Sequence, residues 1–388
     1  MNYRPLIWLA VATFSTGIDG YVLAGLLPAI AADLRVVEAA AGQLVSAFAL
    51  TSALAAPLLS TVTSRWERRT TIALSLGVFV VGNLIVGLAT SYSVALGGRV
   101  VAALGGCLLN AAVTGYVIAL TPAKDHGKAL SFVLGGWMAA TALGVPVGLV
   151  LGQSSWRFPM ILVAVVGTIA LAGILLRLPR LHLPGGTLTD RLRPLGQPRL
   201  LAGLLVTTGI LCSSYTCFTY ATLILRPAFP AEWMMILVMF GYGLASMLGN
   251  AVTGRLTDRF TALRVLTVVL VGLLLDAVLG ALAFTLGGVL VVTGLLWFFA
   301  AGIGNGGAAV PQQARLAALA PDSAAIVMAL NGSAIALGCA LGSGLGGVAL
   351  AAGSSPYGLL AVAAVILTLT LTLHLIVAKV RAYDEVPV

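Results

Sequence analysis

Charged side chains are scarce in this chain. Asp, Glu, Lys and Arg make up 9% of its 388 residues, whereas 60% are hydrophobic. A soluble domain carries roughly 25% charged residues, so a mean hydropathy of +1.08 excludes a soluble protein with a charged surface. The few charges cluster between long apolar runs. The composition therefore indicates a polytopic helical membrane protein.

Several catalytic and metal-binding patterns are also missing. The sequence has no GxxxxGK[ST] run, which excludes an ATP-binding P-loop. It has neither GxSxG nor HExxH, the signatures of common hydrolases. Its four cysteines lie in apolar runs as small buried side chains, and its three histidines lack metal-ligand spacing. We therefore expect no enzyme, no metal and no cofactor, and any transport work must draw on an ion gradient.

Twelve stretches have about the 20 apolar residues that a helix needs to cross a bilayer. They cover residues 6–30, 42–62, 70–90, 94–120, 129–152, 157–177, 200–225, 233–254, 264–285, 288–310, 325–351 and 357–378. The first resembles a signal peptide but is longer than the usual apolar core of about 7–15 residues. We expect it to be a retained helix.

Positive charge is distributed unevenly along the chain. With both termini inside, 17 of the 21 Lys and Arg fall in inner segments and three in outer loops, while Arg99 lies within a span. This bias predicts a multi-pass protein of the cell inner membrane with cytoplasmic termini. It also explains the net charge of +9 without a nucleic-acid partner. The lipid bilayer is the expected partner.

The chain divides into two similar halves. Residues 178–199 are rich in Pro and Gly and are predicted to link an N-terminal half, 1–177, to a C-terminal half, 200–388. An offset of 194 carries Gly144, Gly148 and Gly152 onto Gly338, Gly342 and Gly346. Such repeats are typical of secondary transporters, in which substrate binds between the halves. We predict an all-α membrane protein of twelve transmembrane helices in two pseudo-symmetric six-helix halves, active as a monomer.

Four short motifs resemble those of one transporter family. They are Asp19-Gly20-Tyr21 with Gly25-Leu26-Leu27-Pro28, Gly98–Leu104, Leu143–Gly148 and Gly254–Arg259. Together they are similar to the major facilitator superfamily, in particular to bacterial drug:proton antiporters of the sugar-efflux-like and chloramphenicol-efflux-like branch. One loop departs from the pattern: Ser60, Ser64 and Glu67 stand where the family usually has Gly, Asp and Gly. The inner charge lock is expected to be weakened or rebuilt around Glu67.

Asp19 is the main candidate for proton coupling. It is the only charged residue of the stretch 6–30, and a charged carboxylate in hydrocarbon costs several kcal/mol. Arg99 does not release its proton in proteins, but it can stabilise a nearby carboxylate in one conformation and leave it in another. The alternatives are an acid that stays paired or protonated throughout and an arginine that reaches the headgroups. Asp276 is a second intramembrane acid, for which a structural role is favoured.

Two further groups of residues are predicted. Polar and aromatic side chains within spans indicate a substrate cavity, although each alone also fits a helix–helix hydrogen bond: Tyr21, Asn110, Tyr116, Tyr215, Phe218, Thr219, Tyr220, Asn305, Gln312 and Asn331. Small residues and loop charges indicate a conformational gate: Arg65, Gly144, Pro146, Gly148, Asp258, Arg259, Gly338 and Gly342.

The resemblance implies export of small lipophilic or weakly cationic drugs in exchange for protons, by alternating access. The substrate is then a small molecule, and the proton gradient replaces any cofactor. A sugar or metabolite transporter of the same fold is the first alternative. A transport-inactive membrane sensor is the second.

Overall fold

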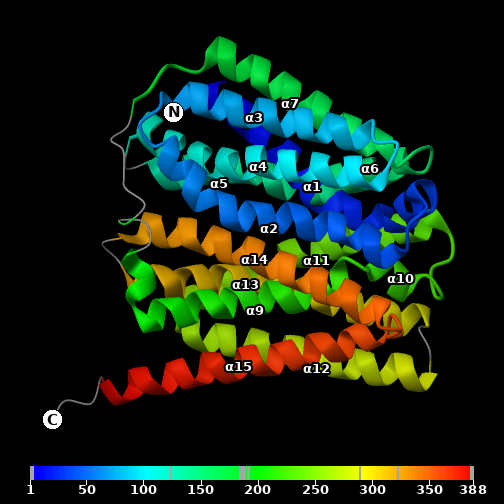
Figure 1. The fold of residues 1–388 in the computed structure, drawn as a ribbon. Coiled ribbons are helices and arrows are strands. Elements are labelled where there is room, and N and C mark those ends of the chain that lie inside the picture. The colour runs from blue at the N-terminus through cyan, green and yellow to red at the C-terminus, as the bar shows by residue number, and fades with distance from the viewer. Residues whose placement is uncertain are drawn as a thin grey trace. The chain divides into compact units, whose positions relative to one another are not determined.

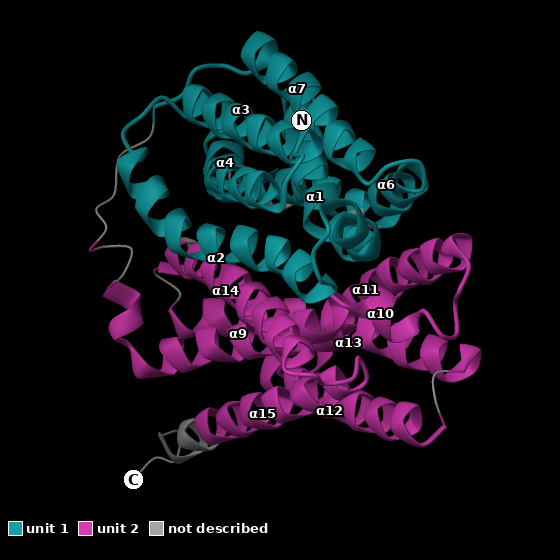
Figure 2. Cartoon of the chain, turned by 45° about the vertical axis from the view of Figure 1, so that its right-hand side comes forward, with its two compact units in different colours: residues 1–188 teal, residues 189–388 magenta. Residues whose placement is uncertain are grey.

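The computed structural model describes residues 4–122, 125–182, 189, 193–287, 290–320 and 323–384. Within these residues, twelve helices are long and apolar enough to cross a membrane, which confirms the predicted number. The chain separates into two compact units, 1–188 and 189–388 (Figure 2). The division falls inside the stretch predicted as a linker, of which residues 183–188 and 190–192 lie outside the described part.

The first unit contains six spans (Figure 1). Its helices are α1 (Arg4–Leu34), α2 (Glu38–Val62), α3 (Arg68–Gly87), α4 (Tyr92–Leu120), α5 (His126–Ala139), η2 (Ala140–Gly144), α6 (Val145–Gly152) and α7 (Arg157–Arg177). The segments α5, η2 and α6 follow one another directly and form the fifth span.

The second unit repeats this plan. A short 3₁₀ turn, η3 (Arg193–Gly196), precedes α9 (Pro198–Phe218), α10 (Ala221–Leu225), α11 (Glu232–Arg259), α12 (Ala262–Gly287), α13 (Val291–Leu319), α14 (Ala324–Ala351) and α15 (Gly358–Asp384). Two differences from the sequence prediction concern the first and fourth spans of this unit. The stretch 200–225 is interrupted, because Tyr220 leaves helical geometry between α9 and α10. The tenth span extends to Leu319, because its polar residues Gln312 and Arg315 find buried partners.

Glycines set the packing of the fifth span on the first. A side chain at Gly144, Gly148 or Gly152 would collide with Ile18, Val22 or Leu26 of α1 respectively. The spacing of four on both helices places them parallel and in close contact. The second unit has a similar arrangement, since a side chain at Gly338 or Gly342 would collide with α9 and one at Gly346 with Tyr220 just after it. The glycines matched by the offset of 194 therefore allow the close approach of two helices in each unit.

The fifth span passes through a π-helical turn just before Pro146. The residues of η2 widen the helix, and the N–H of Val145 bonds to the carbonyl of Ala140, five residues back. Proline lacks an N–H and its ring crowds the preceding turn. A π turn accommodates such a residue without ending the helix. Gly144 therefore reaches α1 at the point where the helix is irregular.

Candidate functional site

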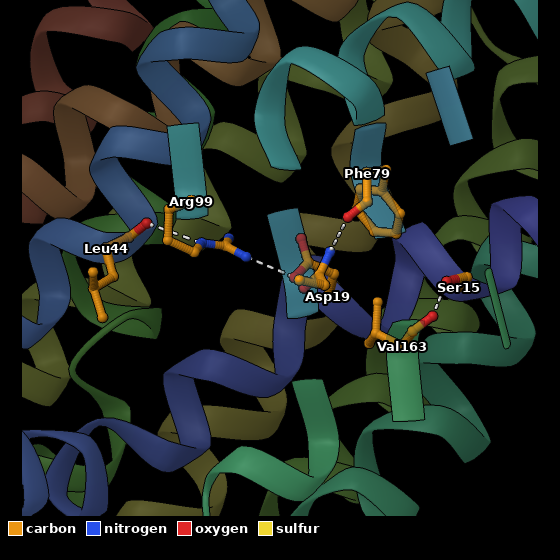
Figure 3. Close-up of polar contacts among 7 residues, drawn as sticks. Ser15, Asp19, Leu44, Phe79, Arg99 and Val163 are labelled. Atoms are coloured by element: carbon orange, nitrogen blue, oxygen red, sulfur yellow. Dashed lines mark hydrogen bonds and ion pairs between the residues drawn. The ribbon is translucent and has the colours of Figure 1, made fainter. Parts of the chain in front are cut away.

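Asp19 of α1 and Arg99 of α4 form a buried ion pair within the first unit (Figure 3). Nη1 of Arg99 donates to Oδ1 of Asp19 at 2.6 Å, and the two side chains are 2% and 0% exposed. Nε of Arg99 donates to the carbonyl of Leu44 at 3.2 Å. The guanidinium carbon lies 4.3 Å from the centre of the Phe48 ring. Both Leu44 and Phe48 belong to α2, so Arg99 is held between α1 and α2.

One oxygen of the carboxylate is left without a donor. Oδ2 of Asp19 is buried and has no hydrogen-bond partner among the described residues. An ionised carboxylate accepts several hydrogen bonds, and a buried acceptor without one is costly. The position is therefore one where binding a proton is chemically useful, since a protonated oxygen becomes a donor.

Two further polar side chains lie buried in the same unit. Ser15, one helical turn before Asp19, donates to the carbonyl of Val163 on α7 at 2.8 Å. Asn83 of α3 is fully buried, and its Nδ2 donates to the carbonyl of Phe79 at 3.1 Å. Sequence reasoning did not select Asn83, although an amide inside the apolar stretch 70–90 was a detectable signal.

Asp276 has a different environment. It lies on α12 of the second unit, is partly exposed, and forms no hydrogen bond or ion pair with any described residue. It therefore lacks the cationic partner that Asp19 has. The structure places the two predicted acids in separate units.

The predicted cavity residues of the first unit differ in their burial and in their contacts. The ring of Tyr21 meets Trp137 of α5 edge to face at 6.4 Å. Asn110 on α4 has an exposed side chain. Tyr116, in contrast, is fully buried and its hydroxyl donates to the carbonyl of Pro179 at 2.8 Å. Tyr116 thus ties α4 to the chain that follows α7.

Four aromatic rings of the second unit form a cluster, which continues from Phe298 to Trp297 at 5.6 Å. Phe218 lies 5.8 Å from Tyr215 and 5.0 Å from Tyr242, and Tyr242 lies 4.6 Å from Phe298. Nδ2 of Asn305 donates to the Tyr242 hydroxyl at 3.2 Å. The cluster joins α9, α11 and α13, and it brings together three residues predicted to contact substrate: Tyr215, Phe218 and Asn305.

The other predicted cavity residues of this unit make helix–helix contacts. Nε2 of Gln312 donates to the carbonyl of Gly203 at 2.6 Å and to Thr207 at 2.8 Å, and Thr207 donates to Asn331 at 2.8 Å. The Tyr220 hydroxyl donates to the carbonyl of Ser343 at 3.0 Å, while Thr219 is fully buried.

A second buried cation was missed by sequence reasoning. Arg315 of α13 is 5% exposed, and its Nη1 lies 2.8 Å from Nδ1 of His374 on α15. Nε2 of His374 lies 2.9 Å from the Thr267 hydroxyl on α12, which itself donates to the carbonyl of Leu263. Arginine only donates, so His374 accepts at Nδ1 and donates from Nε2 as a neutral ring. Arg315 was assigned to a loop because the tenth span was predicted to end at residue 310.

Glu67 replaces the expected charge lock with hydrogen bonds. Its carboxylate accepts from the N–H groups of Arg69, Thr70 and Leu181 and from the Thr70 hydroxyl, at 2.6–3.1 Å. Partial burial alone would raise the pKa of Glu67, but these donors outweigh it and lower the pKa to about 2. Arg69 also donates to the carbonyls of Leu175 and Leu178. Glu67 therefore caps α3 and fastens the chain after α7 to it.

The gate residues divide into buried and exposed groups. Gly144, Gly148, Gly338 and Gly342 are buried at the helix contacts described above, and Pro146 adjoins the π turn. Arg65, Asp258 and Arg259 are exposed and form no ion pair with any described residue.

The fold and the site together define a polytopic transporter: two six-span units, a matched glycine packing in each, and a buried acid–arginine pair within a span. A sequence model of the Major Facilitator Superfamily matches residues 9–275. The chain belongs to the major facilitator superfamily and is a multi-pass membrane transporter.

Several known proteins are similar over most of the chain. The MFS-type transporter YtbD of Bacillus subtilis (strain 168), itself uncharacterized, is 30% identical over 355 residues, covering 89% of this chain and 88% of the relative. The chloramphenicol resistance protein of Streptomyces lividans is 35% identical over 314 residues, covering 74% and 79%. The inner membrane transport protein YdhP of Escherichia coli (strain K12) is 28% identical over 365 residues, covering 91% and 90%.

Solved transporters share the fold. A bacterial homologue of the human lysosomal transporter Spinster, in an inward-facing and occupied conformation, has a TM-score of 0.77 at 17% identity, covering 98% of each chain. A D-xylose–proton symporter has a TM-score of 0.74 at 15% identity, covering 95% of this chain and 97% of the other. At these identities the likeness concerns the fold alone.

Proposed function

We propose that this chain exports small lipophilic or weakly cationic drugs across the bacterial inner membrane in exchange for protons. The proposal places both termini in the cytoplasm and treats the single chain as the active unit, because each chain carries both six-span units. The observation that carries it is the buried Asp19–Arg99 pair, in which one carboxylate oxygen has no donor among the described residues.

Asp19 is the proton carrier in this proposal. In the ionised form its Oδ1 accepts from Arg99, as in the described arrangement. A proton from the outer side binds Oδ2, cancels the negative charge and weakens the hold on Arg99. Release on the inner side restores the pair. Because Arg99 keeps its own proton, it acts on the carboxylate and is not itself a relay.

Export follows if substrate and proton oppose each other. A cationic or polarised substrate favours the ionised Asp19, whereas protonation disfavours that substrate, so each promotes release of the other. A potential of 100 mV is worth about 2.3 kcal/mol per charge, enough for roughly 50-fold accumulation per proton. The carrier thus needs no nucleotide or metal.

The proposed substrate class has two supports. A relative at 35% identity is named for chloramphenicol resistance. The cluster of Tyr215, Phe218, Tyr242 and Phe298 offers apolar rings with few charges, which suits lipophilic compounds. Sugars and nucleosides are tested as competing substrates in the experiment below.

The experiment uses purified protein in liposomes with an imposed pH gradient and an internal pH dye. Lipophilic drugs, sugars and nucleosides are added in turn, and proton flux is compared for the wild type, Asp19→Asn and Asp33→Asn. Asp33 is the matched control because it is an exposed carboxylate at the end of the same helix. We expect drug-evoked flux in the wild type and Asp33→Asn but not in Asp19→Asn.

Three results would count against the proposal. Flux that survives in Asp19→Asn moves the proton site elsewhere, with Asp276 next. Flux evoked by sugars or nucleosides but not by drugs replaces the substrate class. Substrate uptake without proton flux in the wild type identifies a facilitator and removes antiport.

A further inference from the structure

We propose that Asn83 of α3 is the second partner of Asp19 and accepts the hydrogen bond from its carboxyl group when Asp19 carries the proton. The inference rests on the proposed role of Asp19 and adds a positioning residue to it. When the proton binds, the Oδ2–H bond of Asp19 forms, a hydronium ion becomes water, and the new O–H donates to Oδ1 of Asn83.

The first observation is a matched pair of unsatisfied acceptors. Oδ2 of Asp19 and Oδ1 of Asn83 are both buried, and neither has a hydrogen-bond partner among the described residues. Both side chains are 0% exposed. Two buried acceptors cannot satisfy each other, but a proton placed on the carboxylate oxygen of Asp19 turns it into a donor for the amide oxygen of Asn83.

The two side chains lie at the same depth. A side chain at Gly167 of α7 would meet Val80 of α3 and Ser15 of α1, so these residues are level. Both α1 and α3 run antiparallel to α7, because residue numbers rise on α7 as they fall on its neighbours. From the level of Gly167, a later residue of α7, Gly173, meets an earlier residue of α1, Trp8, and an earlier residue of α7, Met160, meets a later residue of α3, Gly87.

Counting along the parallel helices gives the relative height. Asp19 follows Ser15 by four residues and Asn83 follows Val80 by three. At 1.5 Å per residue, their heights differ by only about 1.5 Å.

Asn83 also faces the side on which α1 packs. On α3, Val80 meets α7 at Gly167 and Gly82 meets α4 at Ala102. Around the axis of α3, Asn83 lies between the directions of Val80 and Gly82, so it points toward the groove between α4 and α7. α1 occupies that groove, since Ser15 donates to Val163 of α7 and Asp19 pairs with Arg99 of α4.

The orientation of the amide is fixed by its other contact. The Phe79 carbonyl only accepts, so the Asn83 group that faces it must be Nδ2, at 3.1 Å. Oδ1 is then the group left to accept from elsewhere. Figure 3 shows Arg99 and the Phe79 carbonyl on opposite sides of Asp19. The ionised carboxylate has its partner at Oδ1, and the protonated one gains a partner at Oδ2.

Few other charges can influence this site. Among the described residues of the helices packed against α1, Arg99 of α4 is the charged group in contact with Asp19. The remaining ionisable side chains of these helices lie near helix ends, except the thiol of Cys107 on α4: Glu38 on α2, Tyr92 and Tyr116 on α4, His126 and Lys128 on α5, and Arg157 and Arg177 on α7. Arg68 and Arg69 lie at the start of α3, and α1 itself carries Tyr21 and, near its end, Asp33. The η2 and α6 segments carry none.

The test compares Asn83→Leu, which removes the acceptor at similar volume, with Asn83→Thr, which retains an oxygen acceptor. Ser75→Ala is the control, because Ser75 is a buried residue of the same helix that donates only within it. The pH midpoint of drug-evoked proton flux is measured for each. Loss of one hydrogen bond to the protonated form weakens proton binding about tenfold. We expect the midpoint of Asn83→Leu to move about one pH unit toward acid, with Asn83→Thr close to the wild type and Ser75→Ala unchanged.

A second readout does not depend on transport. In pH-difference infrared spectra of purified protein, the carbonyl stretch that Asp19→Asn abolishes belongs to protonated Asp19. We expect that band at higher frequency in Asn83→Leu, because the carboxyl group has lost its acceptor. If Asn83→Leu does not fold, Asn83→Ala carries both measurements with the same expected shifts.

The outcomes separate the two proposals. An unchanged midpoint and band in Asn83→Leu, with Asp19→Asn inactive, overturn the role of Asn83 and leave the antiport proposal intact. Flux that persists in Asp19→Asn overturns the antiport proposal. A shifted carboxyl band in that case still supports Asn83 as the partner of Asp19.

Discussion

Replacing Arg99 by methionine is expected to destabilise the first unit strongly. Arg99 and Asp19 are 2% and 0% exposed and joined at 2.6 Å, and removing one partner of a buried pair costs about 3–5 kcal/mol. Methionine also loses the contact with the Phe48 ring, worth about 1–2 kcal/mol when desolvated. We therefore expect Arg99→Met to lower the free energy of unfolding by about 4–7 kcal/mol.

A double-mutant cycle isolates the pair from these other contacts. Asp19→Leu leaves the guanidinium buried without its carboxylate and is expected to cost about 3–5 kcal/mol, whereas the double variant leaves no buried charge at this site. The double variant should therefore be less destabilised than the sum of the singles by at least about 2 kcal/mol. The assay is unfolding of purified protein in a denaturant titration, with Arg226→Met as a matched control at an exposed arginine.

Additive costs would refute this reasoning. If the double variant equals the sum of the singles within about 0.5 kcal/mol, the two side chains are energetically independent. The ion pair would then not be the interaction that holds α1 against α4, and the coupling mechanism would lose its physical basis.

Three other perturbations give sharp expectations. Glu67→Gln should remove a stabilisation of about 1 kcal/mol, discounted for exposure, that the wild type has above pH 4.5 and loses as pH falls toward about 2, as measured by unfolding between pH 3 and 7. His374→Leu removes the Nδ1 acceptor that lies 2.8 Å from Nη1 of Arg315 and should cost about 1.5–3 kcal/mol in the same denaturant titration, whereas His374→Gln should cost less. Gly148→Val should abolish transport in the liposome assay, because its side chain collides with Val22, whereas Gly115→Val, with open space around it, should not.

The number and type of the helices followed from hydropathy, and the repeat followed from glycine spacing. Both are local properties of the sequence: an apolar run of sufficient length has to be a helix in lipid, and a glycine every fourth residue forms a smooth face. The wrong end of the tenth span has a clear physical cause. Hydropathy marked 288–310 as a span, but Gln312 and Arg315 continue the helix because other helices of the same unit supply their partners.

The partners of polar side chains could not be predicted in the same way. Asp19 and Arg99 were selected singly because a charge in an apolar run is conspicuous, but their contact depends on the relative height of two helices 80 residues apart. Tyr116 and Tyr215 were given the same expected role from sequence. The structure separates them, since Tyr116 bonds to the Pro179 carbonyl while Tyr215 joins an aromatic cluster.

The sequence does not determine the relative heights of residues on neighbouring helices. The glycine contacts supply this information. Each glycine that meets a neighbouring helix fixes one level, and two such levels fix the direction of the helix. The contacts at Gly167 and Gly87 give Asn83 nearly the same height along the helix axes as Asp19. An amide that looked like one polar residue in an apolar run thereby becomes the proposed acceptor, because Oδ2 of Asp19 is a buried oxygen without a donor among the described residues.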